Sequence, residues 1–188
     1  FKMIECQISD IKILQSEIKV VKMSYEEADK ALKEDKVLSK LNVLAKSHKA
    51  FRNENGAIKL DLPNVDVKIK NKKVDIQIQT DSESRKLVAE MMVIAGRVIA
   101  QYANEHEISM PFLTQEVGSF SEDIIQNKEN LTAAQAFQAT RCFKQSKITP
   151  KASLHAGLGL SCYVRVTSPI RRYLDLLTQQ QLVRFINN

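Results

Sequence analysis

The residues best suited to chemistry lie together near the carboxyl end of the chain, at Thr167, Ser168, Pro169, Ile170, Arg171 and Arg172. Two guanidiniums beside two hydroxyls, at a point where a helix is expected to begin, favour binding of an anion. Guanidiniums form paired, charge-assisted hydrogen bonds with phosphate oxygens, and the free N–H groups at a helix start add further donors. The segment therefore predicts a phosphate-binding site. The alternative interpretation is that both arginines pair with acidic neighbours and only hold the packing together.

The sequence also predicts how this segment is positioned. Thr167 or Ser168 is expected to cap a helix that begins at Pro169, since proline has no N–H to lose there. Both arginines would then lie in the first turn, where the helix dipole disfavours cations unless an anion is bound. Upstream, Gly157 and Gly159 allow the backbone to approach another part of the chain closely. Downstream, an apolar stripe at helical spacing predicts packing on a core, through Ile170, Tyr173, Leu174, Leu177, Leu182 and Phe185.

Composition excludes several classes of protein. The chain has 188 residues, and 28 Lys and Arg against 22 Asp and Glu give a net charge of +6, a mild bias toward polyanionic partners. Its three cysteines, Cys6, Cys142 and Cys162, are too widely spaced for a disulfide framework or a thiolate zinc site, so a reducing, cytoplasm-like compartment is expected. The histidines lack zinc-binding spacing. No stretch has the character of a membrane span or a signal peptide.

Hydrophobic periodicity predicts a mixture of strands and helices. The longest apolar stripe, at 82–104, predicts a central, deeply packed helix. Within it, Glu90 lies among apolar residues, so its carboxylate needs a partner or a polar cavity. His48 lies on the apolar face of another helix and is interpreted as a core or boundary residue. The other expected elements are a strand at 4–8 with a partner at 11–21, a capped helix at 24–34, a helix from 37 to 55, a hairpin at 65–78, an extended segment at 110–115, a helix at 132–143 and strands around Pro150.

The segment at 167–173, followed by Asp175 and Leu176, resembles the signature of the ribonuclease II and ribonuclease R family of exoribonucleases. Five more segments resemble that family in the same order, at 24–27, 52–58, 84–95, 111–116 and 155–160. The resemblance implies an α+β fold, in which a mixed, mostly antiparallel β-sheet is wrapped by helices around an RNA channel. All of residues 1–188 would then be part of a single catalytic domain of this type.

The same resemblance implies an activity for the full-length protein. Members of the family hydrolyse single-stranded RNA from its 3′ end and release nucleoside 5′-monophosphates, using magnesium to activate water. The main hypothesis is therefore a magnesium-dependent 3′→5′ exoribonuclease, expected to be a monomer in the cytoplasm or an organelle. Two alternatives remain open. One is a catalytically inactive relative that binds RNA or acts as a scaffold, and the other is a structural domain with a basic surface patch.

The resemblance also assigns roles to individual residues. Arg171 matches the arginine that faces the scissile phosphate, so it is the expected catalytic residue. Arg172 is expected to support the fold or an adjacent phosphate, and Thr167 and Ser168 are expected to contact RNA beside it. Tyr25 matches an aromatic residue that contacts bases, with a packing role at the helix start as the alternative. Glu90 belongs to a region with two adjacent acidic residues in many family members, and an RNA contact is expected there.

The sequence departs from the family pattern in several places. Ala89 replaces the first of the two acidic residues, and Arg165, Val166 and Gln179 stand where other residues are usual. No aspartate cluster of the kind that binds magnesium occurs, so the metal ligands are expected upstream of this chain. RNA-binding barrels of the cold-shock and S1 type are also absent from the sequence. The chain is therefore interpreted as a fragment that is inactive by itself.

Overall fold

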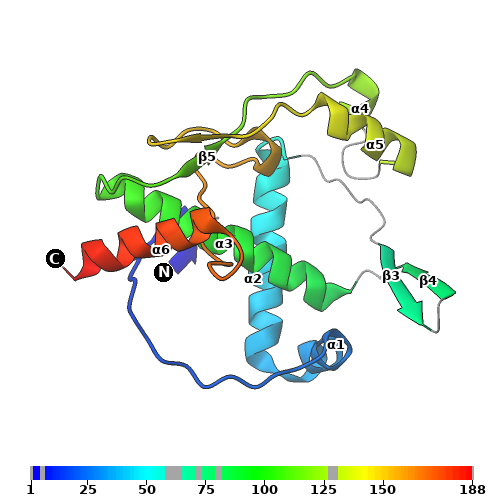
Figure 1. Ribbon diagram of the computed structural model, residues 1–188, viewed down its shortest axis with the longest axis horizontal. Helices are drawn as coiled ribbons and strands as arrows, with labels where there is room; N and C mark the ends of the chain where they lie inside the picture. Colours follow the sequence, from blue (N-terminus) through cyan, green and yellow to red (C-terminus); the bar gives the residue numbers. More distant parts are fainter. Residues whose placement is uncertain are drawn as a thin grey trace.

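The computed structural model describes residues 2–4, 7–57, 65–70, 73–78, 82–126 and 131–187. Helices and short strands are mixed along the chain, which confirms the α+β class (Figure 1). The described strands form three separate antiparallel pairs, β1–β2, β3–β4 and β5–β6, instead of one continuous sheet. The elements are β1 Lys2–Ile4, β2 Gln7–Ser9, α1 Tyr25–Glu34, α2 Lys36–Glu54, β3 Val65–Lys70, β4 Lys73–Ile78, α3 Glu83–Glu105, β5 Phe112–Thr114, α4 Glu122–Gln126, α5 Ala133–Cys142, β6 Lys147–Thr149, the short 3₁₀ helix η1 Ala156–Leu158 and α6 Tyr173–Ile186.

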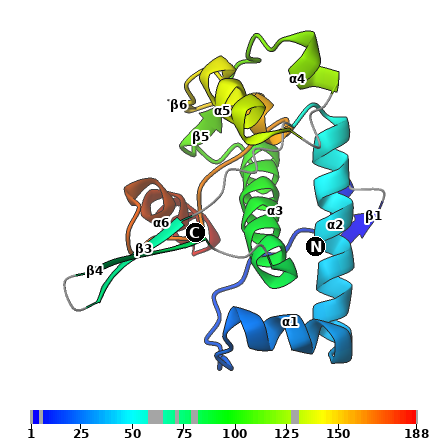
Figure 2. The same ribbon diagram turned by 90° about the vertical axis from the view of Figure 1, so that its right-hand side faces the viewer.

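Helices α2 and α3 form the centre of the molecule (Figure 1). Helix α1 lies at one end of this pair, whereas β5, β6, α4 and α5 gather at the opposite end in both views. The hairpin β3–β4 projects away from the helices (Figure 2). Helix α6 packs against the carboxyl half of α3, because Leu182 shares a buried cluster with Ala100 and Ala103. The central helix predicted from the apolar stripe is thus confirmed as α3.

Local capping explains where several helices begin. Ser24 and Glu27 form the predicted capping box of α1: the Glu27 N–H donates to Ser24 Oγ at 3.2 Å, and the Ser24 N–H donates to Glu27 Oε2 at 2.7 Å. Ser82 Oγ accepts from the Arg85 N–H at the start of α3, and Thr132 caps α5 in a second capping box. These side chains satisfy N–H groups that have no partner inside the helix.

The apolar core surrounds α3 on two sides. One cluster joins its carboxyl half to β5 and α6, and a smaller one joins Ile94 and Val98 to Ile8 of β2. Gly96, in the middle of α3, lets another segment lie directly on the helix. A Cβ added to Gly96 would be 2.3 Å from the Tyr163 ring and 2.4 Å from the Val164 carbonyl oxygen. Glycine at this position therefore permits close packing of the segment that leads to residues 167–172.

The expectation for the first strands was wrong. Lys2–Ile4 and Gln7–Ser9 are two strands that pair with each other, with Met3 opposite Ile8, whereas one strand was expected over 4–8, of which residues 5 and 6 lie outside the described residues. The predicted partner at 11–21 has no regular structure. Ile11 and Ile13 do pack against the core, whereas Ile18 and three neighbouring apolar residues are exposed. The alternation of apolar and polar residues in this segment therefore reflects partial burial of the side chains and not hydrogen bonding to a neighbouring strand.

Candidate functional site

The segment with the predicted phosphate chemistry forms a tight turn in front of α6. The N–H groups of Arg171 and Arg172 both donate to the Ser168 carbonyl oxygen, at 3.3 and 3.1 Å. Asp175 closes the turn from the other side, since its Oδ1 accepts from the Ser168 N–H at 2.8 Å and from Arg172 Nη2 at 2.8 Å. Arg172 Nη2 also lies 3.4 Å from Thr167 Oγ1. Residues 168–172 are referred to below as the signature turn.

The predicted start of this helix was therefore wrong. Helix α6 begins at Tyr173, and neither Thr167 nor Ser168 caps it through its side chain. The N-cap is Arg172, whose backbone is extended with φ −131° and ψ 117°. The Ser168 N–H is directed to the carboxylate of Asp175, so the turn is a separate unit that Asp175 ties to the helix. Pro169 lies in this turn and is not the first helical residue.

The two arginines of the signature turn have different environments. Arg172 is partly buried and forms an ion pair with Asp175, so the alternative interpretation, pairing with an acidic neighbour, is confirmed for this residue. Arg171 is exposed, and among the described residues its guanidinium has no ion pair or hydrogen bond. Its neighbour Ile170 is fully exposed, at 101%. The turn therefore presents one guanidinium to solvent and uses the other inside the protein.

The glycine-containing loop before the signature turn is fixed to the rest of the fold. Gly159 has a positive φ of 63°, and a Cβ there would be 2.4 Å from the Arg52 carbonyl oxygen at the end of α2. The Gly157 N–H donates to Gln115 Oε1 at 3.0 Å, and Gln115 Nε2 donates to the Lys144 carbonyl oxygen at 2.7 Å. Both glycines therefore allow the close approach that the sequence predicts.

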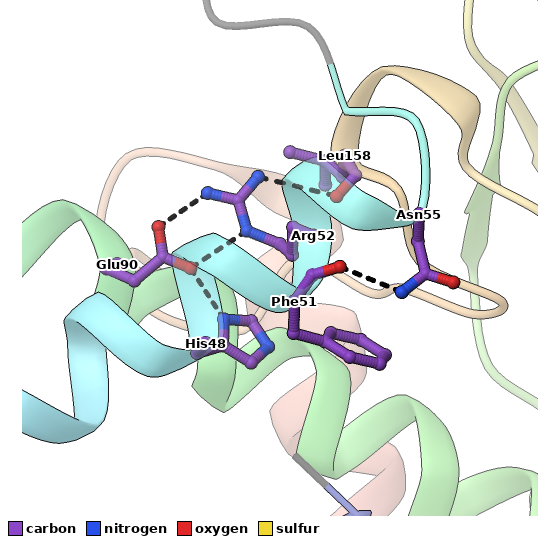
Figure 3. A network of polar contacts seen from close by, with 6 residues as sticks. All are labelled: His48, Phe51, Arg52, Asn55, Glu90 and Leu158. Carbon is purple, nitrogen blue, oxygen red and sulfur yellow. Dashed lines mark hydrogen bonds and ion pairs between the residues drawn. The ribbon is translucent and has the colours of Figure 1, made fainter. Parts of the chain in front are cut away.

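A buried polar network joins α2, α3 and this loop (Figure 3). Arg52 forms a paired contact with Glu90, with Nε 2.8 Å from Oε1 and Nη2 2.5 Å from Oε2. His48 Nδ1 lies 2.5 Å from the same Oε1. Arg52 Nη1 reaches on to the Leu158 carbonyl oxygen at 3.4 Å. Glu90 thus has the partners that its apolar surroundings require. Arg52, which Glu90 holds in place, connects the loop at 157–160 to the centre of the fold.

Charge and burial act in opposite directions on Glu90. Burial raises the pKa of Glu90, but the hydrogen bonds from His48 and Arg52 outweigh that effect, and the net pKa is lowered. The carboxylate is therefore ionised near neutral pH and can only accept, so His48 Nδ1 carries the proton that it donates. His48 is fully buried, which confirms its interpretation as a core residue. Protein groups already engage both oxygens of Glu90. The RNA contact expected of Glu90 remains a prediction.

Tyr25 lies apart from this network, at the first position of α1. Its side chain is 38% exposed, and the Arg85 guanidinium carbon lies 4.1 Å from the centre of its ring. This contact joins α1 to α3, because Arg85 is in the first turn of α3. A hydrophobic staple would involve the residue before the cap and not the first helical residue. One face of the ring is thus occupied by a cation, and base contact through the exposed part remains a prediction.

The described residues do not fit a magnesium ion. Nowhere in the part of the chain that the structure describes do three His, Cys, Asp or Glu side chains come together as a metal site. Asp175 is buried, and one of its oxygens is bonded to Ser168 and Arg172. Magnesium needs several converging oxygen ligands in near-octahedral geometry. None of the described helices has the length and apolar character required to cross a membrane.

Sequence reasoning missed the roles of Asp175, Arg52 and Gln115. A signal existed for the first two. Asp175 follows Arg172 by three residues, the spacing of side chains that meet on a helix. Arg52 follows His48 by four residues, a spacing that places both side chains on one face of a helix. Gln115 gave no such signal, because its contacts come from segments 29 and 42 residues away.

Comparison with known proteins gives consistent matches over nearly the whole chain. A model of the RNB domain matches residues 4–188. An uncharacterized ribonuclease of Synechocystis sp. is 33% identical over 189 residues, which cover 95% of this chain and 28% of that protein. Ribonuclease R of Chlamydia pneumoniae is 26% identical over 221 residues, covering 93% of this chain and 32% of that protein. The chain therefore spans about a third or less of the length of these relatives.

Solved structures share the fold. An active-site mutant of the Dss1 exoribonuclease from Candida glabrata gives a TM-score of 0.75 at 22% identity, covering 89% of this chain and 24% of that one. Mycoplasma genitalium RNase R in complex with ribose methylated single-stranded RNA gives 0.68 at 18% identity, with coverage of 84% and 31%. Yeast Ssd1, a pseudonuclease, gives 0.57 at 12% identity, with coverage of 85% and 24%. At these identities the likeness establishes the fold alone.

Proposed function

Because the chain belongs to the RNB domain family, we propose that the whole protein is an exoribonuclease that shortens single-stranded RNA from its 3′ end and releases nucleoside 5′-monophosphates. The observation that carries the proposal is the exposed guanidinium of Arg171, which a bonded turn holds at the surface without a protein partner among the described residues. A cation placed in advance can stabilise the charge that develops on a phosphate during hydrolysis without reorganising.

In this proposal the residues of the signature turn divide their work. Arg171 faces the scissile phosphate and stabilises its charge. Thr167, which is exposed, contacts the RNA backbone, whereas Ser168 and Arg172 keep the turn in shape through Asp175. Tyr25 contacts a base through the exposed part of its ring, where stacking tolerates any sequence.

The proposed activity uses magnesium, although the described residues contain no site for this ion. A divalent ion supplies an activated water and neutralises phosphate charge. Because the described residues do not fit it, we place its ligands outside them. We also propose that the protein works as a monomer in a reducing compartment, the cytoplasm or an organelle.

The test uses the full-length protein and RNA that carries a label at its 5′ end. Magnesium-dependent, stepwise shortening of the labelled strand, with mononucleotides identified by mass spectrometry, is the expected result. Immediate loss of the 5′ label as a mononucleotide would show the opposite direction. Internal fragments without mononucleotides would show an endonuclease. A chelator control separates metal-dependent cleavage from contamination by metal-independent ribonucleases.

A second candidate function is RNA binding without hydrolysis. It is favoured by one observation: the fold is shared with yeast Ssd1, a pseudonuclease, so the fold alone does not require activity. The same assay decides between the two. Binding whose affinity falls steeply with salt, as phosphate contacts require, together with no mononucleotide release, would support the binding protein and contradict the enzyme.

A further inference from the structure

Asp175 lies just after the signature turn, in α6, and the proposal above gives it only the task of holding Ser168 and Arg172. Its side chain is fully buried, at 0% exposure, in the first turn of α6. Through a single oxygen it holds both ends of the turn, the Ser168 N–H and the Arg172 guanidinium, each at 2.8 Å. The helix dipole favours a carboxylate in this position. The turn is therefore attached to the helix through one carboxylate oxygen.

This attachment separates the two arginines. Arg172 is drawn inward, where its charge is neutralised by Asp175. With Arg172 fixed and the Ser168 carbonyl bonded to the N–H groups of both arginines, the side chain of Arg171 is left on the outside of the turn. Without Asp175, Ser168 and Arg172 would lose their shared acceptor, and two cations would compete for the same phosphate.

We propose that Asp175 is a positioning residue for RNA turnover, which fixes the signature turn so that Arg171 alone is presented to the scissile phosphate. The inference rests on the proposed function. It assigns no contact with RNA to Asp175. Its effect on catalysis passes through Arg171, and this distinguishes positioning from a general contribution to the stability of the fold.

Two substitutions separate the charge of Asp175 from its geometry. Asp175 Oδ2 has no hydrogen-bond partner in the described structure, so Asp175→Asn can place its amide nitrogen there and keep Oδ1 as the acceptor. Asp175→Ala removes both the charge and the Oδ1 acceptor. Thr178→Val is the matched control, because Thr178 is equally buried on the next turn of α6, and its hydroxyl likewise has no partner in the described structure. The Asp175 variants are compared with Arg171→Ala, which removes the guanidinium that Asp175 is proposed to position.

The experiment measures kcat, KM, RNA dissociation constant and melting temperature for these variants of the full-length protein. We expect Asp175→Ala to lower kcat at least 10-fold with KM changed less than 3-fold, because a displaced charge-stabilising group costs about as much as a missing one. The kcat of Asp175→Asn should fall between those of Asp175→Ala and the wild type. Thr178→Val should retain wild-type kcat. The deciding result is the double variant Asp175→Ala with Arg171→Ala, which should be no slower than Arg171→Ala alone.

The proposal is overturned if the two losses multiply in the double variant, or if both Asp175 variants turn over RNA at the wild-type rate. Asp175→Asn keeps the test decisive should Asp175→Ala fail to fold. A wild-type protein that binds RNA but does not hydrolyse it would contradict the proposed function only. In that case RNA affinity is measured for Asp175→Ala, Arg171→Ala and the double variant. If their losses of binding free energy add in the double variant, the positioning role is overturned. A protein that neither binds nor hydrolyses RNA overturns both.

Discussion

Two adjacent arginines of identical chemistry differ in what surrounds them, and the difference decides what each can do. Arg172 meets a buried carboxylate three residues away, whereas Arg171 meets solvent. A guanidinium already neutralised by a carboxylate contributes little to stabilising a second anion, but an unpaired one retains its full charge for that purpose. The sequence placed both residues in a phosphate site, and only the structure separated them, since their separation depends on the direction of a turn.

Replacement of Arg171 by alanine in the full-length protein should lower RNA turnover far more than RNA affinity. Loss of one charge-stabilising group typically costs about 10²–10³-fold in kcat, or roughly 3–4 kcal/mol of barrier. Steady-state hydrolysis and equilibrium binding, measured on the same preparation, check this. Arg184→Ala is the matched control, because Arg184 is an exposed arginine in the last turn of α6, and its loss should leave kcat unchanged. Near-normal turnover of Arg171→Ala would exclude the assigned role.

At the scale of elements, most helices and the paired strands β3 and β4 were predicted well, whereas the first strands and the start of α6 were not. Capping boxes and apolar stripes are local signals, and they located α1, α3 and α5 to within a residue or two of their ends. The pairing of β1 with β2 is local, but the alternating pattern does not specify which residues pair. The start of α6 depends on Asp175, a side chain that redirects the Ser168 N–H. Periodicity cannot report such interactions, which explains where the predictions failed.

The contact between α3 and the segment at 163–164 predicts the effect of Gly96→Ala. Alanine in a helix interior is favoured over glycine by about 1 kcal/mol when exposed. Here the new Cβ would lie 2.3 Å from the Tyr163 ring and 2.4 Å from the Val164 carbonyl oxygen. Overpacking of this kind costs about 1–3 kcal/mol, so the substitution should lower the melting temperature.

Two comparisons decide the outcome for Gly96→Ala. Ala89→Gly, at an exposed position of the same helix, measures the propensity difference alone. A melting temperature of Gly96→Ala equal to or above that of the wild type would show that Tyr163 does not lie against α3.

The network of His48, Arg52 and Glu90 predicts how the contact between α2 and α3 responds to acid. Since the pKa of Glu90 is lowered in the folded protein, the unfolded state binds a proton more readily as the pH falls. The stabilisation from Glu90 is therefore complete above its ordinary pKa of 4.5 and is lost as the pH falls through the lower folded value. Hydrogen exchange of α3 amides, followed by mass spectrometry, should show acid-induced opening in this window.

Glu90→Gln should remove this part of the acid response and should also destabilise the contact at neutral pH. The second effect follows because Arg52 would lose its ionic partner in a largely buried position, a change that typically costs about 3–5 kcal/mol. Glu34→Gln, at the exposed end of α1, removes the same charge without a buried partner and should behave like the wild type. An unchanged pH profile in Glu90→Gln would mean that another group controls the response of α3.

At the scale of the whole molecule, family membership could be inferred from the sequence more fully than the site could. Six segments in the family's order predicted the α+β fold that the solved structures share. The site required three dimensions, because Glu90 meets Arg52 from 38 residues away and Arg52 meets the loop at Leu158 from 106 residues away. Identical motifs in an unfolded chain would give neither contact. The family thus follows from local pattern, whereas the chemistry depends on long-range packing.

The chain of 188 residues, expressed by itself, should not hydrolyse RNA with or without magnesium. Metal-assisted hydrolysis needs converging oxygen ligands to bind the ion and generate a nucleophile from water. The carboxylates of the described residues do not converge in this way, and two buried ones, Glu90 and Asp175, are already held by arginines. Arg171 can stabilise a charged phosphate, but a guanidinium does not deprotonate water at neutral pH.

The measurement incubates the purified chain with labelled single-stranded RNA in millimolar magnesium and then in a chelator, with the full-length protein as the positive control. Magnesium should also leave the melting temperature of the chain unchanged, because an ion without a site does not stabilise the folded state. Mononucleotide release that depends on magnesium, or a melting temperature that rises with it, would place a metal site within these residues. Arg171 would then act beside that site, and the placement of the metal ligands elsewhere in the protein would be wrong.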